Sequence, residues 1–198
     1  FSASGFTLVV IIKFKKFNYH AQIEQQQELF NDCFPEVINY DKEGLQTGVN
    51  NYLWQYQSFP KTPSSREYIA MDDEKIVAYY AALPFRYNIG NKEVETGMVC
   101  GVMTSPNYRK IGLFYKLGNY ASEQQKKENV SFNLTFPIRK AIMPGFIKSG
   151  WDIAFELPLF VKFLKLTSLM KTKKIGLLAF LFNPFISLYN KLRYTTDN

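Results

Sequence analysis

The sequence of 198 residues predicts one α+β domain, in which a mixed sheet lies between layers of helices, followed by a helical C-terminal tail of apolar and basic residues. Two observations support this fold class. Stretches with strand or helix periodicity follow one another in the order strand, helix, helix, three strands, helix, strand, helix, strand. A hydrophobic content of 46% indicates a folded core rather than a disordered chain. We place the domain at residues 7–164 and the tail at residues 165–198.

The first two predicted elements are a strand and a helix. Leu8–Ile12 is short and rich in β-branched residues, and the basic run after it indicates a strand that emerges toward solvent. His20–Phe34 has helical spacing, and we expect Pro35 to end it. The glutamines and glutamates of this helix are expected to lie opposite its apolar face. That apolar face consists of Ile23, Phe30 and Phe34.

A second helix is predicted from apolar residues spaced at i, i+3, i+4 and i+7, which are Val49, Tyr52, Leu53 and Tyr56. The stretch Phe59–Ser65 is rich in proline and serine and ends the helical part of the chain. After this break the apolar pattern changes its period, so we expect a strand-rich part to begin there.

Three consecutive strands are predicted after the break. Arg66–Met71 and Lys75–Leu83 are rich in β-forming residues and are joined by a polar, hairpin-like turn. A further turn at Asn88–Lys92 leads into a strand with the apolar run Met98–Met103, which ends near Thr104.

The remainder of the domain alternates helix and strand. A helix after Gly112 has an apolar stripe and should pack on the sheet. Val130–Phe136 alternates apolar and polar residues, which predicts a strand with one buried face. A short helix is expected around Gly145–Lys148, and Trp151–Leu157 alternates as a further strand. The stripe of the long helix consists of Leu113, Leu117, Tyr120 and Ala121.

The tail has a different composition from the domain. Leu159–Tyr194 mixes basic and apolar residues, and Gly176–Tyr189 holds a run of large apolar side chains that is interrupted by Pro184. This run is shorter than the roughly 20 apolar residues that a helix needs to span a bilayer. It is compatible with a helix at a membrane interface or with a helix covered by a partner.

Charge and cysteine content narrow the choice of partner and compartment. The net charge of +7 and the pI near 9.2 favour an anionic partner, such as nucleic acid, membrane headgroups or a phosphorylated cofactor. Because the basic residues are spread along the chain and no recognition motif is present, we expect no nucleic-acid partner. Cys33 and Cys100 each lie in an apolar pattern, so we expect buried, reduced thiols and a cytoplasmic location.

Two kinds of catalytic site are disfavoured. His20 is the only histidine and stands before a helix, which argues against a Ser-His-Asp mechanism. No cluster of histidine, cysteine and carboxylate residues has the spacing of metal ligands, so we expect no metal.

The stretch between the apolar run Met98–Met103 and the following helix predicts an anion site. Arg109, two spacers and Gly112 stand where that helix starts. Unpaired backbone N–H groups and the helix dipole both favour an anion at such a point, where we place a pyrophosphate. The alternative is that Gly112 merely permits a tight turn and that Arg109 is a solvated surface charge.

This pattern resembles the GNAT superfamily of N-acetyltransferases, whose acetyl-CoA signature is Gln or Arg, two residues, Gly, one residue, then Gly or Ala. Arg109–Phe114 matches all but the last position. Ser105–Arg109 is similar to the family's strand-to-loop approach, and residues 144–151 resemble its later helix and strand. The resemblance covers residues 8–164 and implies a mixed, mostly antiparallel central sheet flanked by helices.

The resemblance also implies where acetyl-CoA binds as co-substrate. It should lie where the strand that ends at Thr104 splays from the strand that carries Asn133, with the pantetheine amides on the first strand's backbone. A backbone N–H near Met103 could stabilise the developing oxyanion. Backbone N–H groups at the helix start would hold the pyrophosphate, and two basic side chains add charge. The implied cofactor-binding residues are Val102, Met103, Thr104, Arg109, Lys110, Ile111, Gly112, Leu113, Phe114 and Asn133.

General acid and base are less clearly indicated. Glu95 is the first candidate for the base that deprotonates the amine, and Glu93 is the second. The alternative for both is a solvated hairpin end. The family often uses a tyrosine from a later helix as the acid, but residues 141–147 contain none, which leaves water or a side chain such as Tyr115.

The acceptor implied by the resemblance is the primary amine of a small molecule, as in acetyltransferases that modify amino sugars or polysaccharides. We expect the acceptor site between the helices near Tyr40–Tyr56 and the C-terminal ends of the strands, where aromatic rings could stack on a sugar. The tyrosines and tryptophan there also suit a core.

Three further expectations remain open. The chain could be a non-catalytic acyl-CoA-binding domain, or it could act at membranes or on partners through the tail Lys162–Arg193. In this fold a seventh strand normally follows the sixth, and nothing after Leu164 clearly supplies it. Either Ile175–Phe182 forms it, or the chain is a fragment of a longer protein, which we favour.

Overall fold

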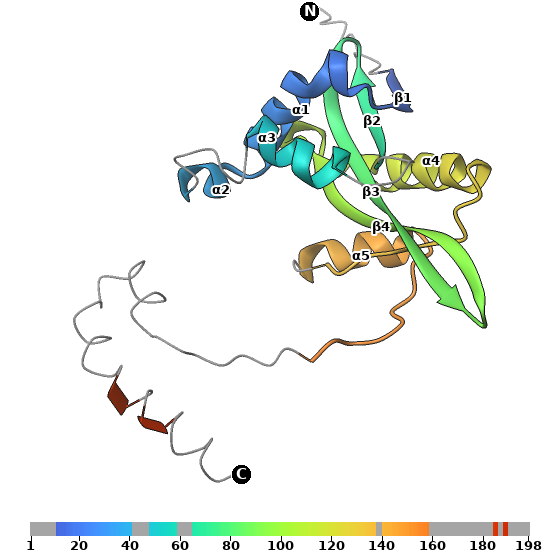
Figure 1. Ribbon diagram of the computed structural model, residues 1–198. Helices are drawn as coiled ribbons and strands as arrows, with labels where there is room; N and C mark the ends of the chain where they lie inside the picture. The colour runs from blue at the N-terminus through green and yellow to red at the C-terminus, as the bar shows by residue number, and fades with distance from the viewer. Residues whose placement is uncertain are drawn as a thin grey trace, which may run out of the picture. The chain divides into compact units, whose positions relative to one another are not determined.

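The computed structural model describes residues 11–40, 48–58, 65–137, 140–158, 184–185 and 188–189 (Figure 1). The chain divides into two units, Phe1–Asp152 and Ile153–Asn198, and each is considered by itself. The predicted boundary between domain and tail, at residues 164 and 165, lies outside the described residues.

One mixed sheet forms the centre of the first unit. Its five described strands are arranged in chain order, and the first three pairings are antiparallel, whereas β4 and β5 pair in parallel. Figure 1 labels the first four of these strands, β1 to β4. This arrangement confirms the predicted α+β fold with a mostly antiparallel sheet. The strands are β1 (Ile12–Lys16), β2 (Arg66–Asp72), β3 (Lys75–Ile89), β4 (Lys92–Thr104) and β5 (Phe132–Leu134).

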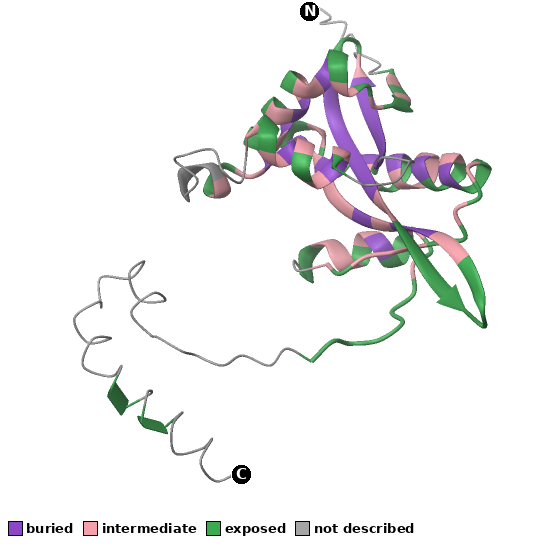
Figure 2. Ribbon diagram, viewed as in Figure 1, coloured by how far each residue is buried: buried purple, intermediate pink, exposed green. Residues whose placement is uncertain are grey.

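Two tight turns hold β2, β3 and β4 in register. The second turn contains Gly90 and Asn91, both with positive φ, which suits the twist of a two-residue hairpin. β3 extends beyond the predicted end at Leu83, because its backbone continues to pair with β4 after its side chains leave the core. Figure 2 shows this exposed end of the β3–β4 hairpin in green.

Helices cover both faces of the sheet. On one face lie α1 (Tyr19–Cys33), α3 (Val49–Tyr52) and the π-helical turn η1 (Leu53–Gln57), and on the other lies α4 (Leu113–Lys127). β3 alternates between the two cores: Tyr79 faces the first and Tyr80 faces the second. The smaller helical segments are α2 (Pro35–Tyr40), η2 (Pro106–Tyr108), η3 (Lys140–Ile142) and α5 (Met143–Lys148).

The first strand lies later in the chain than predicted. Ile12–Lys16 pairs with β2, whereas residues 8–10 lie outside the described residues and Ile11 is outside the strand. Ile12 and Phe14 pack against the α4-side core, and the intervening lysine is exposed. β1 is an edge strand with one face on the core and the other in solvent. A sequence that alternates apolar and basic residues suits such a strand better than a wholly apolar run does.

The buried face of α1 also differs from the predicted one. Its buried residues are Gln22, Gln26, Leu29 and Cys33, whereas the predicted apolar residues only flank them. The buried carboxamides find partners, since the backbone N–H of Asn18 donates to Gln22 Oε1 at 2.9 Å. Pro35 follows the end of α1 as predicted, but it also begins α2.

Two predicted strands are shorter or absent. β5 spans only Phe132–Leu134, and Phe132 is 40% exposed, so the predicted buried face over residues 130–136 is wrong. Residues 151–157 form no strand, because Trp151 packs on Phe146 of α5 instead of entering the sheet. Their alternating apolar pattern lacks a neighbouring strand within the described residues.

Little of the predicted tail is described. Residues 184–185 and 188–189 are helical, whereas Ile175–Phe182 lies outside the described residues. Among the described residues, no helix combines the length and the apolar character that crossing a membrane requires.

Candidate active site

β4 loses a neighbouring strand halfway along its length. β5 pairs with β4 only from Thr96 to Met98, and a side-chain hydrogen bond from Thr135 Oγ1 to the carbonyl of Val99 (3.0 Å) marks the end of that contact. From there to Thr104, β3 is the only described strand that pairs with β4. Among the described residues, no strand therefore pairs with residues 100–104 of β4 on the side that β5 occupies earlier, and we call this stretch the free edge of β4.

A β-bulge lies within this free edge. Tyr79 pairs with Met103 and Ala81 pairs with Cys100, so Gly101 and Val102 together oppose the single residue Tyr80. Gly101 adopts φ +57, a conformation that favours glycine. The bulge turns the backbone at the predicted pantetheine-binding residues out of regular register.

A tyrosine hydroxyl occupies the space beside this glycine. A Cβ atom added at Gly101 would overlap the hydroxyl of Tyr56, which comes from η1. That hydroxyl is also near the Sγ atom of Cys100, at 4.0 Å. Gly101 is therefore required twice, for its backbone conformation and for the close approach of Tyr56.

The start of α4 presents free backbone donors to solvent. Lys110 (φ 69) and Gly112 (φ 77) are both left-handed, and no side chain in the described part of the chain caps the helix at Gly112. Residues 109–112 are exposed. Backbone N–H groups in such a turn form a concave anion-binding surface, and the helix dipole reinforces it.

Arg109 connects this turn to the end of β4. Its Nε atom donates to the carbonyl of Thr104 at 3.3 Å, and the thiol of Cys33 donates to the same carbonyl at 3.4 Å. Burial raises the pKa of the Cys33 thiol, and the nearby Arg109 opposes this shift. Both cysteines are free, as predicted, with Cys33 buried and Cys100 half-buried.

Phe114, which departs from the signature, turns toward α5. A Cβ atom added at Gly145 would lie 3.1 Å from the ring of Phe114, and the ring packs edge-on against Phe146 with centroids 5.1 Å apart. The large side chain thus fits between the two helices. Gly145, which makes room for this ring, was not predicted to have a role.

Asn133 lies before the divergence, not within it. It pairs with Gly97, and its side-chain oxygen occupies the space where a Cβ of Gly97 would be. Gln125 of α4 approaches the same point. The structure therefore places the Asn133 amide over the paired part of the sheet, on the side of α4.

The two predicted bases both form ion pairs. Glu95 accepts a hydrogen bond from Arg66 Nη2 at 2.5 Å, and Arg66, which is 2% exposed, also donates from Nε to Glu128 at 2.9 Å. Glu93 pairs with Arg86 at 3.0 Å on the exposed end of the β3–β4 hairpin. Burial tends to raise the pKa of Glu128, but Lys16 and Arg66 hold it below its ordinary value.

Glu67 is a buried carboxylate that the sequence prediction missed. It is 4% exposed and lies on the face of the sheet that α1 and α3 cover. Four neutral groups donate to it: Tyr52 and Tyr79 at 2.5 Å each, Gln57 at 2.9 Å, and the hydroxyl of Ser65. Burial raises the pKa of Glu67, and the four hydrogen bonds oppose this shift. The alternation of side chains along β2 could have predicted this burial, because Glu67 lies on the same face as the apolar residues Ile69 and Met71.

A small cavity lies between the helices and the bulge of β4. Its volume is about 60 Å³, and carboxamides and aromatic rings supply most of its lining. Tyr52, Tyr56, Gly101 and Met103 all contribute to its wall. The cavity thus lies where the acceptor site was predicted, between residues of the second predicted helix and the strand that carries the cofactor residues.

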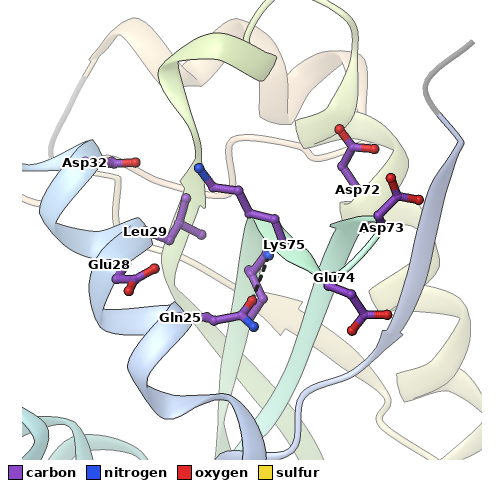
Figure 3. A pocket seen from close by; sticks show the side chains of 9 residues that line it. Gln25, Glu28, Leu29, Asp32, Asp72, Asp73, Glu74 and Lys75 are labelled. Carbon is purple, nitrogen blue, oxygen red and sulfur yellow. Dashed lines mark hydrogen bonds between the residues drawn. The ribbon is translucent and has the colours of Figure 1, made fainter. Parts of the chain in front are cut away.

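A larger cavity, of about 750 Å³, has the opposite electrostatic character to the predicted cofactor site. Glu28 and Asp32 of α1 face the turn between β2 and β3 across it, and among the described residues Lys75 is the one basic residue of its wall (Figure 3). Asp72, Asp73 and Glu74 complete the acidic wall. Such a wall repels phosphates, so the larger cavity is not suited to acetyl-CoA. Among the described residues, no group of histidine, cysteine and carboxylate side chains could hold a metal.

The sequence was compared with protein-family models and with curated proteins. Residues 15–154 match the family model described as "Acetyltransferase (GNAT) domain". No curated protein matches the sequence.

Solved structures share the fold at low sequence identity. A transcriptional regulator from Bacillus halodurans C-125 is 15% identical, with a TM-score of 0.58 over 77% of this chain and 100% of that one. Glucosamine-6-phosphate N-acetyltransferase from Arabidopsis thaliana is 11% identical, with a TM-score of 0.55 over 76% and 98%. AAC(6')-Iy, in complex with the bisubstrate analog CoA-S-monomethyl-acetylneamine, is 12% identical, with a TM-score of 0.58 over 77% and 99%. At these identities the likeness concerns the fold.

Proposed function

The chain belongs to the GNAT acetyltransferase family, and on this premise we propose that it is an acetyl-CoA-dependent N-acetyltransferase that acts on the primary amine of a small molecule. Membership of this family makes the chain an acyltransferase. One observation carries the proposal: the free edge of β4 and the uncapped start of α4 follow each other closely in the chain. The exposed residues 109–112 lead from one to the other.

The residues present suit the parts of acetyl-CoA. Free N–H groups of Lys110–Phe114 suit the pyrophosphate, with positive charge from Arg109 and Lys110. The backbone of Val102–Thr104 suits the pantetheine amides through its free donors and acceptors, although the carbonyl of Thr104 already has two protein donors. Asn133, which pairs with Gly97 one residue before that pairing ends, is the residue of β5 that we propose for cofactor contact. Acetyl-CoA supplies the thioester, whose carbonyl the acceptor amine attacks.

We place the acceptor in the small cavity beside Gly101. Its tyrosines can stack on an apolar ring face, and its carboxamides can both donate to and accept from hydroxyl groups. With a volume of about 60 Å³ against the roughly 300 Å³ or more of a typical ligand pocket, the cavity suits the amine-bearing end of an amino sugar. Relatives in the fold act on glucosamine-6-phosphate or were solved with a CoA-acetylneamine analog, which supports an amine-bearing sugar as the first compound to test.

Calorimetry with acetyl-CoA tests the cofactor site. Gly112→Ala adds a methyl group into open space but disfavours the left-handed conformation of the turn. We expect the turn to relax in the free variant, so binding must restore the left-handed conformation at a cost of about 1–2 kcal/mol and the affinity falls about tenfold. Gly118→Ala, within α4 and also with open space around it, is the matched control and should bind like the wild type. Absence of binding at millimolar acetyl-CoA would contradict the proposal.

Thioester turnover with a panel of amines and amino sugars then separates catalysis from binding. The second candidate is a non-catalytic acyl-CoA-binding domain, which is favoured by one observation: both predicted bases, Glu95 and Glu93, are held in ion pairs. That candidate requires binding without turnover of any amine in the panel.

Three further proposals concern the rest of the chain. We propose the domain bounds 7–164 and the tail 165–198, a cytoplasmic location supported by the free thiols of Cys33 and Cys100, and peripheral membrane contact through the tail. Co-sedimentation with anionic vesicles, before and after deletion of residues 166–198, tests the membrane contact. Equal sedimentation would exclude it.

A further inference from the structure

The carboxylate of Glu67 is buried, and among the described residues its hydrogen-bond partners include no cation. Its described donors are two phenols, a carboxamide and a hydroxyl, which come from the α3–η1 segment, from the residue before β2 and from β3. Burial of a charge that only neutral groups solvate is costly, and such groups concentrate at functional sites. By contrast, the neighbouring residue Arg66, which is also buried, forms ion pairs with two carboxylates, those of Glu95 and Glu128.

Tyr52 connects this carboxylate to the acceptor cavity. Tyr52 forms part of the cavity wall, and its hydroxyl donates to Glu67 Oε2 at 2.5 Å and accepts a hydrogen bond from Gln57 Nε2 at 3.3 Å. Stacking on Tyr19, with centroids 5.5 Å apart and an interplanar angle of 5°, holds the ring in place. Gly101 and Met103 of the bulged β4 edge contribute to the same wall. The hydrogen-bonded pair therefore extends from the cavity into the core.

We propose that Glu67, acting through the hydroxyl of Tyr52, receives the proton that the acceptor amine loses. This inference rests on the proposed function. A proton of the bound ammonium moves to the Tyr52 oxygen as the phenolic proton moves to Glu67 Oε2. The freed amine nitrogen then forms a bond to the acetyl carbon, the bond from that carbon to the CoA sulfur breaks, and the second proton that the nitrogen loses passes through water to the departing thiolate. Tyr52 is the residue at the cavity, and Glu67 is the positioning residue behind it.

Four other ionisable side chains lie near Glu67. The phenols of Tyr52 and Tyr79 donate to Glu67 directly, and Tyr56 and Cys100 face the same cluster. Burial raises the pKa of Tyr52, Tyr56 and Tyr79, and raises the pKa of Cys100 to about 11. These four groups therefore stay protonated near neutral pH, which leaves Glu67 as the carboxyl group of this cluster.

Glu67→Gln and Tyr52→Phe test the relay in the full-length chain, with the most active amine from the panel. We expect each variant to lose about 100-fold in kcat/KM for the amine at neutral pH, with the KM for acetyl-CoA unchanged within about twofold. The double variant should lose no more than either single one, because the two residues act as a unit. The loss should also shrink as pH approaches the pKa of the amine, because the free amine then needs no base.

A control variant, Glu123→Gln, and a variant of the alternative base, Glu95→Gln, complete the test of the relay. Glu123→Gln, on the exposed face of α4, should keep wild-type kcat/KM at every pH. A loss in Glu67→Gln that is the same at every pH would show a structural role and overturn the relay. So would near-wild-type activity of Glu67→Gln together with a pH-dependent loss in Glu95→Gln. If the wild type turns over no amine, the proposed function fails and the relay fails with it. If the wild type is active and Glu67→Gln is equally active, only the relay fails.

Discussion

Gly101→Ala tests the geometry on which the acceptor site depends. The residue has φ +57, and an added Cβ would overlap the hydroxyl of Tyr56. Two separate costs follow. The alanine must adopt a left-handed conformation, and either Tyr56 or the bulge of β4 must move.

The magnitude follows from these two costs. A left-handed alanine costs about 1–2 kcal/mol. An extra methyl group in a packed core costs about 1–3 kcal/mol. We therefore expect the free energy of unfolding to fall by about 3 kcal/mol, which corresponds to a decrease in Tm of roughly 6–12 °C for a chain of this size.

Thermal and urea unfolding of matched variants separate the cost of the left-handed alanine from the cost of its overlap with Tyr56. Tyr56→Phe removes the overlapping hydroxyl, so in that background Gly101→Ala should cost less by about 1–2 kcal/mol, and only the conformational term should remain. Gly118→Ala is the control, since helix propensity predicts a gain of about 0.5–1 kcal/mol there. A Gly101→Ala protein as stable as the wild type, or one equally destabilised in both backgrounds, would refute the reasoning.

Three other substitutions test separate parts of the structure. Glu67 has a raised pKa, so the wild type should lose stability as pH rises from the ordinary value of 4.5 through the raised one, whereas Glu67→Gln should show no such loss in urea titrations at several pH values. Arg66→Met removes the buried partner of two carboxylates that are about one-third exposed, and should lower the free energy of unfolding by about 2 kcal/mol; an unchanged value would mean that the pairs contribute nothing. Phe114→Ala should lower it by about 2 kcal/mol through lost contact with α5, yet keep the affinity for acetyl-CoA in calorimetry; a loss of affinity would place the ring in the cofactor site.

The sequence predicted best the elements whose neighbours are close in the chain. The helix Leu113–Lys127 and the hairpins of β2, β3 and β4 follow from local periodicity and short turns. The free edge of β4 was expected only from the family resemblance, because strand divergence depends on pairing between distant segments. Its bulge at Gly101 had no local signal beyond a glycine in a strand.

Buried polar residues explain most of the remaining differences. Gln22 and Gln26 were assigned to the solvent side of α1 because glutamine is usually exposed, but hydrogen bonds inside the fold allow their burial. Glu67 was overlooked for the same reason. Glu95 was predicted from its strand position, whereas its Arg66 partner lies 29 residues earlier, a pairing that local patterns cannot reveal.

Backbone NMR of the 15N-labelled 23.0 kDa chain, titrated with acetyl-CoA, tests the central proposal most directly. The proposal predicts that the largest amide shift changes fall on Lys110–Phe114 and Val102–Thr104, at the start of α4 and on the free edge of β4. Changes concentrated instead around the acidic cavity of Glu28, Asp32 and Lys75, or no changes at millimolar acetyl-CoA, would contradict it.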